Sequence, residues 1–367
     1  MSHRHSDAPP AHAPERPLTR RAFLRWGGLA AGLAALARPG RIPPATAEVA
    51  RRLQRAAVPP PASSGAPARG KTRLVAFIAN SLSDTLTLAD AHTLEPFGTP
   101  RAGREPHKFR GSLGGASVYS CNTTSNEMIE IDLGTLRPIR RIPILDPYNV
   151  TFTADGRYLY KVAYRYTFVE VHDAHTFRRI AHLETGRQPS HFWLAAARGW
   201  FVNSNQHSHA VTVIDTRRMA VIRRLPVDPL PAGVALSRDD RYLFVASGGA
   251  GTISVFATDD WSLTKRVRSG KDAHEMTMTR DGRTLYVTNR GEDTVSVFDV
   301  PRQRVVAKFP VPGGPDMPVL SPDESQLWVS GRYGNTVTVA DTRTLQILNT
   351  FPTGRSPHRV HLARTQA

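Results

Sequence analysis

The sequence predicts an all-β fold, a seven-bladed β-propeller, from three observations. A strand-rich unit recurs along the chain from about residue 73 with a nearly constant period. Each copy contains strand signals and turn clusters but no helical pattern. The last copy ends in an inner strand that the first copy lacks, so the chain can close on itself. A fixed period in the low forties, with strands alone, is typical of propeller blades.

The clearest copy of the repeat lies between Leu285 and Asp299. A β-rich run, 285–289, is followed by a turn cluster and then by a run with period-two alternation, 294–299. Inner strands such as 276–278, the tight turn at 281–282 and outer strands such as 305–309 complete four strands per repeat. The closing aspartate recurs in steps of 42, 41, 42, 42, 42 and 42 residues, at Asp90, Asp132, Asp173, Asp215, Asp299 and Asp341, with Ala257 in the missing place.

Counting strands indicates how the ring closes. The first repeat begins with a second strand, 74–80, and has no inner strand of its own. The chain ends with an inner strand, 359–363, that has no repeat to follow it. Placing this last strand inside the first blade gives seven complete blades and leaves no long unpaired edge. We therefore expect the C-terminal strand to close the ring.

The N-terminal segment is predicted to direct export. Residues 19–25 read Thr-Arg-Arg-Ala-Phe-Leu-Arg and resemble the twin-arginine export motif. The apolar run 27–37 is too short to span a bilayer and fits the core of a signal peptide. Small-residue cleavage sites lie at 35–37 and 45–47, and the two prolines at 43–44 favour the second. We expect a signal peptide at 1–47, a Pro- and Ala-rich linker at 48–72 and the propeller at 73–367, in a periplasmic, extracellular or cell-surface protein.

The composition excludes several kinds of site. Cys121 is the single cysteine among 367 residues, so neither an intrachain disulfide nor a cysteine-ligated zinc site can form. No apolar run of the mature chain reaches the ~18 residues of a membrane span, and we expect a monomer. Lys and Arg number 48 against 31 Asp and Glu, a net charge of +17. This charge fits either plain solubility or attraction to a polyanion such as DNA, and the lack of a basic cluster with interleaved aromatic residues favours solubility.

The segment 285–299 resembles the signature of the YVTN-repeat β-propeller family, and the resemblance covers about residues 73–365. It implies the propeller fold but not one activity. Propellers of related architecture include cell-envelope proteins, lactonase-like enzymes, and the propeller domains of nitrous-oxide reductase and haem d1 proteins. Some relatives have been linked to DNA binding. The resemblance therefore specifies the fold and leaves the function to the residues of the site.

One column of the repeat concentrates residues that bind ligands. It follows a recurrent proline at 106, 147, 189, 231, 315 and 357, with Ala273 as the exception. This first column reads His107, Tyr148, Ser190, Ala232, His274, Asp316 and His358. The second column reads Lys108, Asn149, His191, Gly233, Glu275, Met317 and Arg359. Because equivalent positions of a closed ring surround one axis, we expect these side chains to meet at one mouth of the channel.

Three functions fit this constellation. The first is a non-catalytic envelope propeller that binds an unknown small molecule or protein partner at the mouth, through His107, Tyr148, His191, His274, Glu275, Asp316, His358 and Arg359. The second is an enzyme or cofactor carrier in which His107, His274 and His358 hold a transition metal or a haem-like group, although the Cys-x-x-Cys-His motif of c-type haem is absent. The third is a polyanion- or DNA-binding propeller. A structural role of the Pro-His pairs is the alternative to all three. We favour the first and assign no catalytic residue.

Export is predicted to depend on Arg20 and Arg21. Replacing both with lysine keeps the charge but removes the guanidinium pair of the motif, so the precursor is expected to stay in the cytoplasm. Cell fractionation with an antibody against the propeller measures this, and Arg16→Lys is the matched control that leaves export unchanged. Export of the double variant at the level of the unchanged chain would contradict the assignment.

Overall fold

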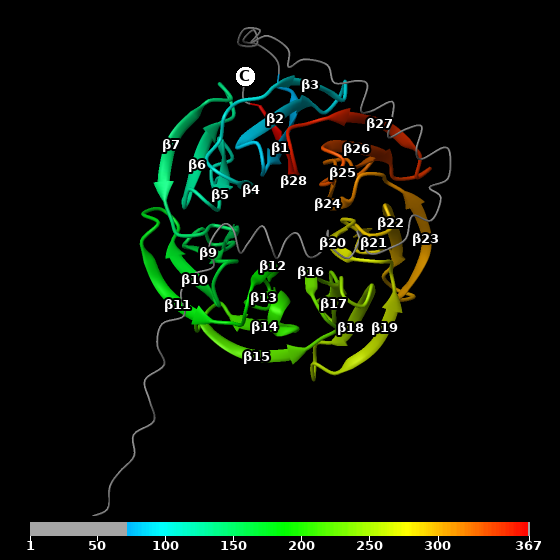
Figure 1. The fold of residues 1–367 in the computed structure, drawn as a ribbon. Coiled ribbons are helices and arrows are strands. Elements are labelled where there is room, and N and C mark those ends of the chain that lie inside the picture. Colours follow the sequence, from blue (N-terminus) through cyan, green and yellow to red (C-terminus); the bar gives the residue numbers. More distant parts are fainter. Residues whose placement is uncertain (1–71, 366–367) are drawn as a thin grey trace, which may run out of the picture. The chain divides into compact units, whose positions relative to one another are not determined.

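The computed structural model describes residues 72–365, which form seven four-stranded antiparallel sheets arranged as blades around an axis (Figure 1). These residues contain 28 strands and one short 3-10 helix, η1 (Gln206–Ser208). Within the described range no helix has the length and apolar character needed to cross a membrane. The predicted seven-bladed propeller is therefore confirmed. The signal peptide predicted at 1–47, and all but the last residue of the predicted linker, lie outside the described residues.

Each blade runs from an inner strand at the axis to an outer strand at the rim (Figure 1). The first blade contains, in this order, β28 (Pro357–Arg364), β1 (Leu74–Asn80), β2 (Thr85–Asp90) and β3 (Glu95–Gly98). The second blade contains β4 (Pro106–Gly111), β5 (Ser117–Asn122), β6 (Glu127–Asp132) and β7 (Pro138–Pro143). The third contains β8 (Asn149–Phe152), β9 (Tyr158–Val162), β10 (Phe168–Asp173) and β11 (Arg179–Glu184). The fourth contains β12 (Pro189–Ala195), β13 (Trp200–Asn205), β14 (Ala210–Asp215) and β15 (Ala220–Pro226). The fifth blade contains β16 (Pro231–Leu236), β17 (Tyr242–Ser247), β18 (Thr252–Ala257) and β19 (Leu263–Arg268). The sixth contains β20 (Ala273–Met278), β21 (Thr284–Asn289), β22 (Thr294–Asp299) and β23 (Arg304–Pro310). The seventh contains β24 (Pro315–Leu320), β25 (Gln326–Gly331), β26 (Thr336–Asp341) and β27 (Ile347–Pro352).

The stacking of blades explains the distribution of apolar residues in the repeat. The second strand β17 and the third strand β22 are buried almost throughout, whereas the outer strand β23 alternates exposed and half-buried residues. The described core divides into seven apolar clusters, each shared by two neighbouring blades. In one of them the rings of Phe244 and Phe298 lie 5.5 Å apart between centroids. Burial of each such side chain contributes about 1.5–3 kcal/mol, so the blades are held together mainly by these layers.

The turns between strands use the residues that the sequence indicates. Gly156 and Gly282 have φ angles of 69° and 71° at the turn after the inner strand, a left-handed conformation that glycine adopts without strain. The Oδ1 atom of Asp341 accepts hydrogen bonds from the N–H groups of Arg343 and Thr344. The other closing aspartates accept equivalent bonds, because a short polar side chain can satisfy the backbone of its own turn.

The C-terminal strand closes the ring, as the sequence predicts. β28 pairs antiparallel with β1 along the whole of β1, and the Arg73 N–H donates a hydrogen bond of 3.0 Å to the Thr365 hydroxyl at the end of this pairing. Val360 is fully buried and packs against Trp328 and Val337 of the preceding blade. The pairing removes the inner edge that β1 would otherwise expose. It also places β28 next to β4 at the axis.

Candidate functional site

The inner strands carry the first column of the repeat to the axis. Six of them begin at the recurrent proline or at Ala273, and only β8 begins two residues after its proline. In β4, β12, β16, β20 and β24 the pairing register with the second strand shifts just after this first residue. A bulge of this kind re-aims the side chain that follows. The first column can therefore leave the regular pleat and contact residues of other blades.

His107 and His358 lie in neighbouring blades with their rings in contact, at a centroid distance of 3.6 Å. The Tyr148 ring of the following blade lies 4.0 Å from His107 and stacks at 4.4 Å on Tyr164. His107, Tyr148 and His358 are all buried. A stack of aromatic rings thus spans three consecutive blades at the axis.

Asp316 lies on the other side of this stack and has four charged or polar partners. Its carboxylate contacts His274 Nε2 at 3.1 Å and His358 Nε2 at 3.4 Å. Arg290 and Arg332 each donate one hydrogen bond to it, at 3.1 and 3.3 Å. Burial alone would raise the pKa of this carboxyl, but the two histidines and Arg332 hold that pKa well below its usual range. Asp316 is therefore ionised and fixes the orientation of two imidazoles.

The second column forms another layer, toward the middle of the inner strands. His191 Nδ1 contacts the Glu275 carboxylate, although the two residues come from blades that are not adjacent. Gly233 of the intervening blade permits this approach, because a Cβ there would lie 2.8 Å from a carbonyl oxygen of β20. Lys108 Nζ lies 3.2 Å from the Met317 sulfur. Side chains of this layer therefore reach across the axis to blades other than their neighbours.

Residues of the first column link neighbouring blades through their backbone carbonyl groups. The Ser204 hydroxyl donates a hydrogen bond of 2.6 Å to the Ala232 carbonyl of the next blade. The hydroxyls of Thr288 and Ser330 donate in the same way to the carbonyls of Asp316 and His358. These bonds hold adjacent blades together without using the imidazole or carboxylate groups. A purely structural role therefore explains why these positions of the inner strands are fixed, but it does not explain why their side chains are histidine and aspartate.

Burial keeps the histidines at the axis neutral. It lowers the pKa of His191 to about 4, against the raising effect of Glu275, and lowers the pKa values of His107 and His358 well below the ordinary value. A neutral imidazole has one N–H donor and one acceptor nitrogen. Within residues 72–365, His107 Nδ1, His358 Nδ1 and His191 Nε2 have no hydrogen-bond partner. Since an unpaired buried polar atom costs about 1–3 kcal/mol, these nitrogens are suited to receive a ligand.

The structure brings the eight predicted ligand-binding residues together on or beside the inner strands, but not as an open rim. Seven of them are buried and Arg359 is half-buried. We term the buried seven the axial cluster: His107, Tyr148, His191, His274, Glu275, Asp316 and His358. Half-buried inner-strand residues lie instead toward the C-terminal ends of β4, β12, β24 and β28. Access to the axis is therefore greatest from that end of the strands.

The three histidines that the sequence groups as metal ligands do not surround one point. His107 and His358 touch ring to ring, whereas His274 contacts the Asp316 carboxylate. In the part of the chain that the structure describes, no group of three His, Cys, Asp or Glu side chains is arranged to hold a metal ion. The residues as placed do not fit a three-histidine metal site, and the metal assignment stays a prediction.

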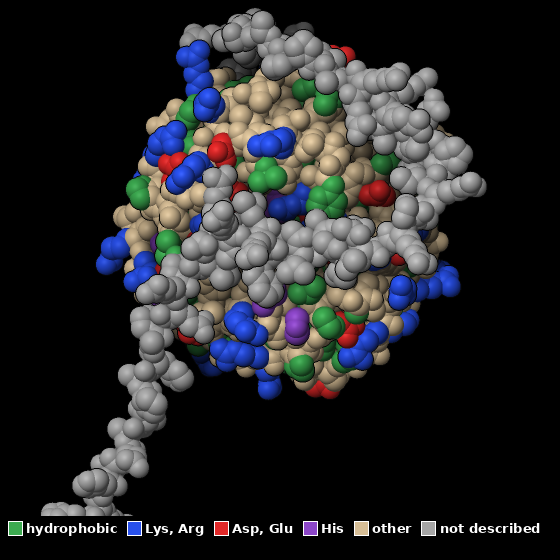
Figure 2. All heavy atoms as spheres, viewed as in Figure 1, with side chains coloured by type: hydrophobic (Ala, Val, Ile, Leu, Met, Phe, Trp, Pro, Cys, Tyr) green, Lys and Arg blue, Asp and Glu red, His purple; other side chains and the backbone are tan. Residues whose placement is uncertain are grey.

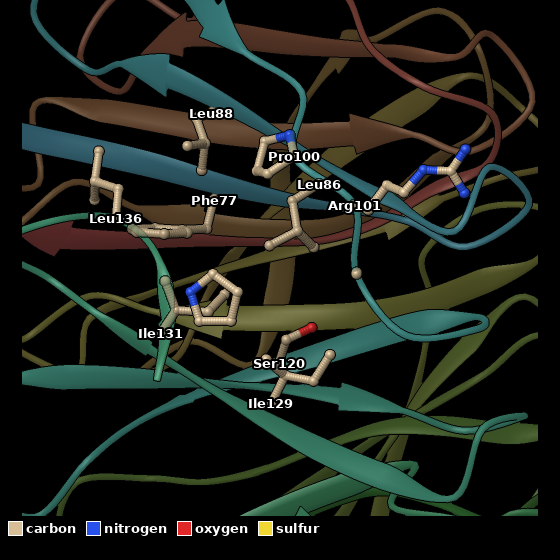
Figure 3. Close-up of a pocket in the computed structure, with 11 residues that line it drawn as sticks. Phe77, Leu86, Leu88, Pro100, Arg101, Ser120, Ile129, Ile131 and Leu136 are labelled. Carbon is tan, nitrogen blue, oxygen red and sulfur yellow. The ribbon is translucent and has the colours of Figure 1, made fainter. Parts of the chain in front are cut away.

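A small apolar hollow lies between the first two blades, away from the axial cluster (Figure 3). Phe77 and Leu88 line it from the first blade, and Ile129 and Ile131 from the second. Its cavity volume of about 10 Å³ leaves room for one water molecule at most. The hollow is a gap in the packing between blades, not a ligand site.

Arg290, Arg332 and Tyr164 belong to the site but are not singled out by the proline column. They occupy a third column of the repeat, which directly follows the second strand in six blades and lies two residues after β9 in the third blade. This column reads Ser81, Thr123, Tyr164, Gln206, Gly248, Arg290 and Arg332. Aligning this position would have found them. The loop pair His207 and His209, a His-x-His motif, is separate from the cluster, and His209 Nδ1 accepts a hydrogen bond from a backbone N–H at 3.2 Å.

Comparison with known proteins supports the fold. The family model described as YNCE-like beta-propeller matches residues 42–365, and no curated protein matches the sequence. The chain is similar to Kuenenia stuttgartiensis hydrazine synthase, with a TM-score of 0.65 and 20% identity over 74% of this chain and 92% of that one. It is similar to a functionally unknown protein from Desulfotomaculum acetoxidans, with a TM-score of 0.68 and 14% identity over 79% and 98%. It is also similar to the dihydro-haem d1 dehydrogenase NirN in complex with DHE, with a TM-score of 0.56 and 17% identity over 94% and 88%.

The lowered histidine pKa values predict that the protein loses stability in mild acid. Below pH ~6.5 the unfolded chain takes up a proton at His191 that the folded chain binds only near pH 4, so the free energy of unfolding falls as the pH falls. The expected loss for this residue is on the order of 1–2 kcal/mol between pH 7 and 5. Urea unfolding at pH 7 and 5 measures it. His191→Gln should reduce the difference between the two pH values and the surface control His175→Gln should not; an equal pH dependence in all three proteins would refute the buried neutral state.

Proposed function

The chain belongs to the YNCE-like β-propeller family, and we propose that it is an exported, non-catalytic binding protein whose axial cluster holds a small molecule or a segment of a partner. The cluster combines neutral imidazoles, a tyrosine ring and two ionised carboxylates in one buried place. Such a mixture can recognise a polar ligand through several hydrogen bonds and a stacking surface. The twin-arginine-like segment at 19–25 supports the exported location.

The observation that carries this proposal is the set of three unpaired imidazole nitrogens at the axis. Native proteins pair nearly all of their buried polar atoms. Here Nδ1 of His107, Nδ1 of His358 and Nε2 of His191 lack a partner within the described residues, and two of these rings are in contact. A ligand that donates or accepts hydrogen bonds at these nitrogens would remove the cost of burying them.

The electrostatics favour binding over acid–base catalysis. A general base works best when its pKa lies near the operating pH. The pKa values of His107 and His358 lie well below that range because of burial. Asp316 already has four partners, so its lone pairs are not free to activate a water. These groups are suited to hold a ligand and poorly suited to move protons.

The basic surface gives less support to a DNA-binding role. Figure 2 shows Lys and Arg side chains in separate groups over the visible part of one face, not in one continuous stripe. Binding along a nucleic acid backbone requires a contiguous basic footprint. A small ligand at the axis is therefore the function that we favour over a polyanion.

Protein produced through its own export route is expected to retain a molecule that denaturation releases. Mass spectrometry of the released fraction identifies it, and elemental analysis of the same sample tests the metal alternative. The double variant His107→Ala, His358→Ala should carry at least tenfold less of the bound molecule than the unchanged chain, because it removes two of the unpaired nitrogens and the ring contact.

The matched control is His207→Ala, His209→Ala, in a loop outside the axial cluster, which should retain the molecule. Circular dichroism checks that both variants keep the fold. Full retention by the axial variant, or a chain that carries no molecule and binds none supplied to it, would contradict the proposal. A stoichiometric metal that the axial variant loses would replace it with the metal alternative.

A further inference from the structure

Two neighbouring inner strands carry basic residues at equivalent positions of the repeat. Lys108 and Arg110 lie on β4, and Arg359 and His361 lie on β28, which packs beside β4. On each strand the residue between the pair packs into an apolar cluster between blades. Since side chains alternate along a strand, both members of each pair lie on the other face. We term these four residues the basic wall.

The basic wall has one carboxylate acting on it, that of Glu275, but no salt bridge to any described residue. No ion pair within residues 72–365 involves Lys108, Arg110 or Arg359. The Lys108 ammonium has only the Met317 sulfur at 3.2 Å, and the two guanidinium groups donate no hydrogen bond to any described residue. Arg110, Arg359 and His361 are half-buried, and Lys108 is buried. Three basic groups are therefore withdrawn from water without a salt bridge to any described residue.

The arginines that contact the axial cluster differ from those of the basic wall. Arg290 is bound to Asp272 and Asp316, and Arg332 to Asp316. The buried guanidinium groups of these two arginines are thus neutralised by aspartates of the chain itself. In the basic wall, burial lowers the pKa of Lys108 to about 7 with a further contribution from Arg359, against the effect of Glu275. Burial also lowers the pKa of Arg110, and Arg359 lowers it further. Burying a charge without a salt bridge is costly, and a bound anion would offset this cost.

We propose that the basic wall binds a small oxyanion, carried by the ligand that the axial cluster holds. This inference rests on the proposed function and adds the charge of the ligand to it. Guanidinium groups bind phosphate and carboxylate through paired hydrogen bonds. Arg110, Arg359 and His361 lie where the inner strands become half-buried, so the anionic group sits toward the accessible end. The polar remainder of the ligand then contacts the axial cluster.

Calorimetric titration tests this with inorganic phosphate and with succinate, each at an ionic strength matched with sodium chloride. We expect one of them to bind with a stoichiometry of one, and the stronger of the two identifies phosphate or carboxylate as the recognised group. Arg359→Met and Arg110→Met should each weaken this binding at least tenfold. Arg304→Met, on the exposed face of outer strand β23, should leave it within about twofold.

Melting in anion-free buffer gives a second readout. Replacing an unpaired guanidinium by methionine should leave the melting temperature of Arg359→Met equal or higher, whereas a structural arginine would lower it. Binding that survives both wall variants, or a melting temperature that falls in Arg359→Met, overturns the inference. If a neutral ligand binds at the axial cluster and neither anion binds, the oxyanion inference is wrong and the proposed function remains valid. Absence of any bound molecule overturns both.

Discussion

The pairing of β28 with β1 is the interaction on which both the ring and the axial cluster depend. It joins the two ends of the propeller, so that Arg73 and Thr365 are hydrogen-bonded although 292 residues separate them. The same strand supplies His358, Arg359 and His361. Without it the first blade would lack its inner strand, His107 would lose its ring contact, and half of the basic wall would be missing. Closure is therefore a condition of the site as well as of the fold.

Charge is distributed unevenly along the axis. At the level of Asp316, two arginines face two carboxylates, Asp272 and Asp316, and the histidines are neutral. At the level of the basic wall, the carboxylate that acts on Lys108 and Arg359 is that of Glu275, which contacts the neutral imidazole of His191. A protein gains nothing in stability from unpaired buried cations. Their presence beside imidazole nitrogens that lack a partner among the described residues supports the binding role that we propose for the axis.

The sequence predicts the fold well because each level of the signal agrees. The period of the aspartate column, the strand count and the orphan strand at 359–363 together predict seven blades and their closure. The proline column also predicts which side chains meet. Their burial and their partners could not be predicted, because contacts across the axis depend on the radius of the ring. Gly233 illustrates this: its lack of a Cβ allows two blades to approach, a requirement that appears only in three dimensions. The proline column does not include Arg290 and Arg332, because they follow the second strand of their blades and not the first residue of an inner strand.

The central claim, that the last strand closes the ring and assembles the site, is tested most directly by thermal unfolding of a chain that ends at residue 356. The comparison is a chain that ends at residue 365, which keeps β28. Loss of β28 removes the pairing along β1 and the burial of Val360, and net contributions of about 0.5–1.5 kcal/mol per hydrogen bond predict a loss of several kcal/mol. The account predicts a melting temperature lower by about 10 °C or more. Equal melting temperatures for the two chains would show that the ring closes in another way.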